Sequence, residues 1–152
     1  MMEIDATDRR ILTALQRDGR ISNADLAERV HLSASACHRR VQRLESEGII
    51  RAYVAMLDPI KVDRPSTIFV EITLTGQADE VLETFEREVA RVQDVLECHL
   101  MAGKADYLLK LVARDTDHFA ELHRVLARLP GVQTMQSSFA LRTVFKTTAL
   151  PV

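Results

Sequence analysis

The strongest candidate chemistry in this sequence lies in a run of basic side chains near residue 40. Three arginines and a histidine fall within positions 38–43, and no acidic residue lies among them. Guanidinium groups bind phosphates and can contact guanine through two hydrogen bonds, and a glutamine amide can contact adenine in the same way. Serine hydroxyls just before the run suit a phosphate at a helix start. The predicted DNA contacts are Ser33, Ser35, His38, Arg39, Arg40, Gln42 and Arg43.

A basic run is often only a solvated helix face, so its setting decides its meaning. This run follows a capped helix and a tight turn, which favours DNA binding over the simpler alternative. Each base contact by an arginine or glutamine would contribute about 1–3 kcal/mol of discrimination. Arg40 is a special case, because helical spacing places it beside Cys37 and Leu44. It could brace the fold or reach a backbone phosphate instead of reading a base.

Helix signals on both sides of the turn predict a helix-turn-helix domain. Asp5 is expected to cap a first helix that runs to about Gly19. Ser22-Asn-Ala-Asp25 has the pattern of a capping box and would start a short second helix. Ser33 would cap the third helix, which Gly48 ends. The third helix would bury a stripe made of Cys37, Val41 and Leu44 and leave its basic face free for the major groove. A short strand over 52–57 is expected to follow.

The rest of the chain predicts an α+β domain. Apolar periodicity alternates between strand and helix in the order β-α-β-β-α-β, which is typical of a ferredoxin-like sandwich. The expected strands are 67–73, 95–102, 107–113 and 132 to about 147, and the expected helices are 79–92 and 116–129. The domains are therefore predicted as a helix-turn-helix unit at 1–57, a linker at 58–65 and the sandwich at 66–152.

One face of the predicted sheet has no helix to cover it. On the expected register this face presents Phe69, Glu71, His99, Met101 and Lys110, a mixed set that is neither dry nor fully polar. An open face of this kind in a domain of under 90 residues suggests a partner, most simply a second copy of the chain.

Composition excludes several classes of protein. Hydrophobic residues make up 47% and charged residues 28% with a net charge of −2, which fits a folded soluble chain. No apolar run approaches the roughly 18–20 residues that span a bilayer, and the charged start is not a signal peptide. Cys37 and Cys98 fit no disulfide or zinc pattern, so a reducing cytoplasm is the expected location.

Enzymatic activity is not expected. No nucleophile, base and orienting group share a suitable spacing, and no glycine-rich phosphate cradle exists. His118 and His123 are five residues apart, and Cys98 and His99 would point to opposite sides of a strand, so neither pair predicts a metal site. We expect no cofactor.

Several segments resemble the Lrp/AsnC family, most closely its leucine-responsive branch. They are Arg20-Ile-Ser-Asn-Ala-Asp-Leu-Ala27, Arg43-Leu-Glu45, Gly48-Ile-Ile50, Gly103-Lys-Ala-Asp-Tyr-Leu-Leu109 and Leu129-Pro-Gly-Val132. The resemblance implies a bacterial or archaeal transcription regulator that binds double-stranded DNA. It also implies a C-terminal domain that dimerises, often within octamers, and that binds a free amino acid or related metabolite.

The resemblance further implies an effector site at the loop between the middle strands, at a subunit interface. The residues carried over are Met101, Gly103, Lys104, Ala105 and Asp106, with Thr134, Gln136 and Ser138 approaching from the same or a neighbouring subunit. Asp106 could accept an ammonium group, and backbone N–H groups near Gly103 could bind a carboxylate. The alternative is a plain hairpin, with positive φ at Gly103 and Asp106 tying the turn.

Two departures from the family pattern affect these expectations. Ala34 stands where the family often has proline, although Ser33 can still cap the helix. Lys104-Ala105 stands where acidic or aromatic residues are frequent in the family, so Lys104 could favour an effector with an extra negative group or could simply point to solvent. A different function, a sensor whose N-terminal helices bind another protein, would require aromatic or large apolar anchors on the third helix. Positions 35, 38, 39, 42 and 43 provide none.

Overall fold

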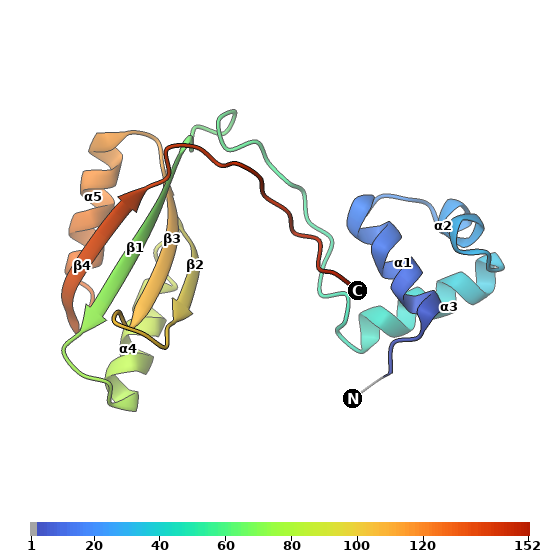
Figure 1. The fold of residues 1–152 in the computed structure, drawn as a ribbon, viewed down its shortest axis with the longest axis horizontal. Helices are drawn as coiled ribbons and strands as arrows, with labels where there is room; N and C mark the ends of the chain where they lie inside the picture. The colour runs from blue at the N-terminus through green and yellow to red at the C-terminus, as the bar shows by residue number, and fades with distance from the viewer. Residues whose placement is uncertain (1–2) are drawn as a thin grey trace. The chain divides into compact units, whose positions relative to one another are not determined.

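The computed structural model describes residues 3–152, which form two compact units (Figure 1). The first unit contains the described residues up to Ala55 together with Phe145–Val152. The second contains Met56–Val144. No helix within residues 3–152 is both long and apolar enough to cross a membrane.

The first unit is built from three helices, as the sequence predicted. They are α1 (Ala6–Arg17), α2 (Asn23–Val30) and α3 (Ala34–Ser46). Each begins at the expected cap: the side chains of Asp5, Ser22 and Ser33 accept hydrogen bonds from backbone N–H groups one turn further on. The turn between α2 and α3 is tight, since His31 ends α2 in the left-handed conformation with φ of 59°.

The core of the first unit hides the predicted inner side of α3. Cys37 and Leu44 are fully buried against Ile11, Leu26 and Val30, and Val41 packs at the edge of the same cluster. Because these apolar side chains hold α3 against α1 and α2, the opposite face of α3 is left to solvent.

Two expectations about extended segments are wrong. Residues 52–57 form no strand, and the last strand ends at Phe139 instead of near Thr147. Strands need a hydrogen-bonding neighbour, and among residues 3–152 the backbone of 52–57 bonds to none. The segment after β4 makes one backbone hydrogen bond to β1, from the N–H of Ala140 to the carbonyl of Thr67 at 3.0 Å, and the pairing does not continue beyond it. The tail is held in another way: the Gln16 side-chain amide donates to the carbonyl of Leu150 at 3.0 Å and accepts from its N–H at 2.7 Å.

The second unit is the predicted ferredoxin-like sandwich. Its elements are β1 (Ser66–Leu74), α4 (Asp79–Val89), β2 (Val95–Leu100), β3 (Tyr107–Ala113), α5 (Thr116–Ala127) and β4 (Val132–Phe139). The strands lie in the order β2-β3-β1-β4, and every neighbouring pair is antiparallel.

Both helices cover the same face of this sheet (Figure 1). Phe85 of α4 and Leu126 of α5 share one core with the alternate residues Ile68, Val70 and Ile72 of β1. The other face carries the intervening side chains and has no covering element within the second unit. Four of the five residues expected there lie on it, and Met101 directly follows the end of β2. Phe69 on this face is 38% exposed.

Candidate functional site

The outer face of α3 carries the predicted DNA-contacting side chains together. Ser35, His38, Arg39, Gln42 and Arg43 are exposed, and Ser33 lies at the N-terminus of the helix. Geometry between α2 and α3 is fixed in part by a hydrogen bond of 2.9 Å from the Asn23 side chain to the carbonyl of Ala34. The helix begins at Ala34 with Ser33 as its cap, as expected.

Three of these side chains are free to meet a ligand. Among the hydrogen bonds and ion pairs found in residues 3–152, none uses the side chains of His38, Arg39 or Gln42. A guanidinium and an amide on one exposed helix face can make the paired hydrogen bonds that base edges offer in the major groove. This arrangement is suited to reading DNA sequence.

Arg40 and Arg43 instead pair with carboxylates at the start of α1. Arg40 Nη1 lies 2.6 Å from Asp5 Oδ2 and 2.9 Å from Asp8 Oδ1, and Arg43 Nη2 lies 2.6 Å from Asp8 Oδ2. Arg40 thus links α3 to the start of α1, which is the structural role that the sequence left open for it. The same engagement of Arg43 was not expected, because the sequence gives no sign that position 43 lies close to position 8.

Electrostatics at this junction favour the ionised forms. The N–H of Asp8 and the Arg40 guanidinium lower the pKa of Asp5 from 3.8 to about 2. The same carboxylates raise the pKa of Arg40. Arg40 and Arg43 remain partly open, with 32% and 45% of their side chains exposed, so their outer edges can still reach a backbone phosphate.

A second site is a hollow of about 160 Å³ at the β2–β3 loop. Its lining consists of Glu71, Met101, Ala102, Gly103, Lys104, Ala105, Tyr107 and Leu108. Four of the predicted effector residues therefore line one concave surface: Met101, Gly103, Lys104 and Ala105. Within residues 3–152, the backbone N–H groups of Gly103, Lys104 and Ala105 donate to no other protein group.

Asp106 does not lie where it could accept an ammonium group, although that role was expected from the sequence. It is buried and absent from the lining, and its oxygens accept hydrogen bonds from the N–H of Leu74 at 2.7 Å and from the Gln77 side chain at 2.8 Å. Both partners lie on β1 or in the segment after it, so the carboxylate does not tie the β2–β3 turn as the alternative from the sequence had it. Gly103 does not have the positive φ of that alternative either.

Glu71 is the carboxylate that the hollow does contain. It lies on β1 and is exposed on the open face of the sheet. The alternation of β1 placed Glu71 on this face, but the sequence could not show that β1 lies beside the loop. That proximity follows from the pairing of β1 with β3, in which Glu71 is opposite Leu108.

The three predicted residues of β4 lie on the same open face but outside the hollow. Thr134, Gln136 and Ser138 pair with Thr73, Glu71 and Phe69 of β1, and paired residues share a face. The structure thus separates the predicted effector residues into a loop group around the hollow and a strand group beyond β1.

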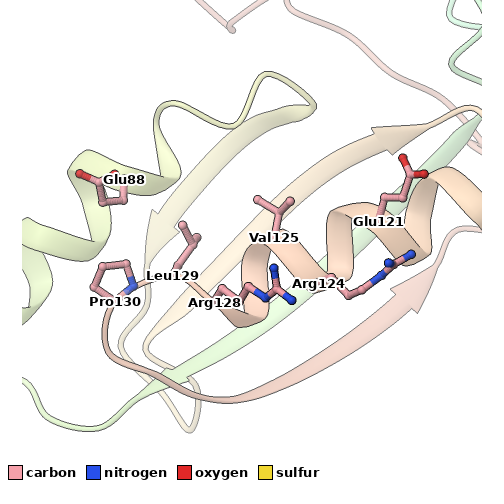
Figure 2. Close-up of a pocket in the computed structure, with 7 residues that line it drawn as sticks. All are labelled: Glu88, Glu121, Arg124, Val125, Arg128, Leu129 and Pro130. Atoms are coloured by element: carbon pink, nitrogen blue, oxygen red, sulfur yellow. The ribbon is translucent and has the colours of Figure 1, made fainter.

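A larger hollow of about 520 Å³ lies between α4 and α5 (Figure 2). Arg124 stands on α5, Arg128 directly follows that helix, and Glu88 stands on the facing helix (Figure 2). The hollow contains none of the predicted site residues, and its lining mixes both signs of charge with Val125 and Leu129. Nothing in this lining selects one class of ligand.

The two cysteine thiols are poor nucleophiles in this structure. Burial raises the pKa of the Cys37 thiol, and burial together with Glu86 raises the pKa of Cys98 to about 11. Both shifts disfavour the reactive thiolate. Residues 3–152 contain no group of three potential metal ligands.

Comparison with known proteins follows the division into two units. Residues 4–51 match a winged helix-turn-helix DNA-binding domain, and residues 67–150 match the Lrp/AsnC ligand binding domain. The leucine-responsive regulatory protein of Escherichia coli K12 is 41% identical over 151 residues, which cover 99% of this chain and 92% of that protein.

Solved structures agree with this match. An AsnC family transcriptional regulator from Agrobacterium tumefaciens superposes with a TM-score of 0.93 at 37% identity, covering 97% of this chain and 96% of that one. A transcriptional regulator of Neisseria meningitidis in complex with L-methionine has a TM-score of 0.93 at 39% identity, covering 98% and 97%.

Proposed function

Since the chain belongs to the Lrp/AsnC family of DNA-binding transcriptional regulators, we propose that a free amino acid controls its binding to specific operator sequences. The observation that carries this proposal is the pairing of two features in one chain. One is an exposed, basic face on a helix held by a helix-turn-helix core. The other is a hollow with a carboxylate and free backbone donors.

The proposed DNA contacts of α3 fall into base contacts and phosphate contacts, according to whether each side chain already has a partner within the protein. Arg39, Gln42 and His38 read base edges in the major groove, because no side chain or backbone group of residues 3–152 holds them by a hydrogen bond or ion pair. Ser33 and Ser35 contact phosphate at the helix N-terminus, and Arg40 and Arg43 contact phosphate with their exposed edges.

In the second unit the amino acid occupies the loop hollow. Glu71 accepts the ammonium group, and the N–H groups of Gly103, Lys104 and Ala105 donate to the carboxylate. Met101 supplies apolar contact, and Lys104 would favour a ligand with a second negative group. The L-methionine bound to the Neisseria regulator supports the chemical class of ligand proposed here.

The working form is a homo-oligomer of at least two copies, compatible with assembly to an octamer. A second copy would cover the open sheet face, and the β4 group of Thr134, Gln136 and Ser138 would then approach a ligand or the neighbouring subunit. Two α3 helices of a dimer would read half-sites about one helical turn apart, or a multiple of that distance. We propose a regulator and not an enzyme, located in the cytoplasm.

A thermal-shift screen of the twenty amino acids tests the ligand proposal. A ligand held only by the native state stabilises it by about 2.7 kcal/mol at a hundredfold excess over Kd. We expect one amino acid or a small related group to raise Tm in a concentration-dependent way. No shift with any of the twenty would contradict an amino-acid effector and leave the DNA-binding assignment in place.

A further inference from the structure

The junction between α1 and α3 is built around a buried charge. Among residues 3–152, Asp8 and Asp106 are the charged side chains that are buried, and Asp8 is fully so. A carboxylate without solvent is strongly disfavoured unless cations and hydrogen bonds surround it. Both oxygens of Asp8 are so engaged, by Arg40, by Arg43 and by the N–H of Asp5 at 3.2 Å.

The two arginines that satisfy this charge belong to the DNA-contacting helix. Arg40 and Arg43 are three positions apart on α3, so both guanidiniums reach the start of α1 from the same side of the helix. Asp5 adds a second carboxylate on Arg40 while its other oxygen caps α1. Arg39 and His38 lie outside this network.

We propose that Asp8 is a positioning residue for DNA recognition, which restrains Arg40 and Arg43 so that Arg39 is the arginine of α3 that reads bases. This inference rests on the proposed DNA-binding function. Asp8 touches no DNA in this account. It acts by limiting Arg40 and Arg43 to the phosphates that their exposed edges reach, so that neither guanidinium can leave α1 to bind a further phosphate.

The charge balance gives the proposal a measurable consequence. The three arginines carry three positive charges, and Asp5 and Asp8 neutralise two of them locally. Releasing a guanidinium to contact one more phosphate steepens the dependence of log K on log salt by about 0.9. The released cation binds every duplex alike, so affinity for unrelated DNA should rise more than affinity for the operator.

Asp8→Asn is the direct test, with Asp18→Asn as the matched control. Asp18 ends α1, is exposed and accepts a hydrogen bond from the N–H of Arg20 at 3.0 Å, which an asparagine can also accept. Both variants therefore lose one negative charge without a change of size, and only the first removes the carboxylate that pairs with Arg43, while Arg40 keeps Asp5. The operator is first selected from a pool of random duplexes. Each protein is then titrated onto this operator and onto a scrambled duplex across a salt series, at a temperature where circular dichroism shows that the protein is folded.

For Asp8→Asn we expect a salt slope on scrambled DNA steeper by about 1 and an operator preference reduced at least about fivefold, the low end of one base contact. Asp18→Asn should match the wild type in operator preference. A structural role alone would lower Tm and leave slope and preference unchanged in the folded variant, and that result would overturn the proposal.

Asp5→Asn keeps the test decisive if Asp8→Asn does not fold. Asparagine caps helices as well as aspartate does, so α1 should persist while Arg40 loses one of its two partners. We expect the salt slope and the operator preference of Asp5→Asn to change in the same direction as in Asp8→Asn, but by less. A salt slope and operator preference equal to those of Asp18→Asn would overturn the proposal. A wild-type chain that binds no duplex selectively would refute the proposed function itself. Selective wild-type binding with unresponsive variants would refute only this inference.

Discussion

The two carboxylates nearest the loop hollow, Glu71 and Asp106, differ in what they contact. Glu71 is exposed toward the hollow, whereas both oxygens of Asp106 are used inside the protein. Their substitution should therefore separate ligand binding from folding.

We expect Glu71→Gln to abolish most of the Tm increase caused by the cognate amino acid, with the ligand-free Tm unchanged. Asp106→Asn should instead lower the ligand-free stability by about 1–3 kcal/mol, because its buried hydrogen bonds to Leu74 and Gln77 are weakened. Thermal melts with and without ligand measure both effects. A full ligand shift in Glu71→Gln would remove that residue from the site.

The lowered pKa of Asp5 leads to a second prediction, which concerns the dependence of Tm on pH. Its folded pKa of about 2 lies below the ordinary 3.8, so the ionised carboxylate favours the native state. This contribution is complete above about pH 4 and is lost as pH falls toward 2. We expect Tm to fall less steeply across this window in Asp5→Asn than in the wild type. Parallel Tm curves for the two proteins would show that the pairing of Asp5 has no net effect on stability.

At the level of helices and strands, what sequence could predict depended on how local the signal was. Caps at Asp5, Ser22 and Ser33 and the alternation in β1 are local signals, and they predicted the first three helices and the first strand. Whether residues 52–57 form a strand, and whether the last strand continues beyond Phe139, depends on a neighbouring strand to pair with. The apolar periodicity of one segment does not reveal whether such a neighbour exists.

Site residues follow the same division. The exposed face of α3 and four residues of the loop could be predicted, since helix spacing and hairpin position fix them. The pairing of Asp8 with Arg43 and the approach of Glu71 to the loop could not, because each joins positions more than thirty residues apart.

The tail segment Phe145–Val152 is attached to α1 through Gln16, and this contact can be tested by itself. Two solvent-exposed hydrogen bonds to Leu150 contribute at most about 1 kcal/mol each. Gln16→Ala should therefore leave Tm nearly unchanged but speed carboxypeptidase removal of the tail severalfold. Arg17→Ala, an exposed neighbour on α1, is the control. Equal digestion rates in the two variants would show that Gln16 does not hold the tail.

For the whole molecule, the uncovered sheet face is the feature that calls for a second copy. Phe69 stands exposed at its centre, between Lys110 of β3 and Ser138 of β4. Phe69→Glu should shift the mass measured by light scattering toward the monomer, because a charge would be buried in the interface. Val125→Glu, on the exposed side of α5, should keep the wild-type mass. A monomeric wild type at micromolar concentration would contradict the oligomer.

The central claim is that α3 reads DNA through its free arginine, and the operator preference of Arg39→Ala tests it most directly. Arg87→Ala, an exposed arginine of α4, serves as the control. We predict that Arg39→Ala weakens operator binding by about 1–3 kcal/mol and reduces the preference for the operator over a scrambled duplex, with an unchanged melting curve. A folded Arg39→Ala protein with wild-type operator affinity and preference would contradict the account.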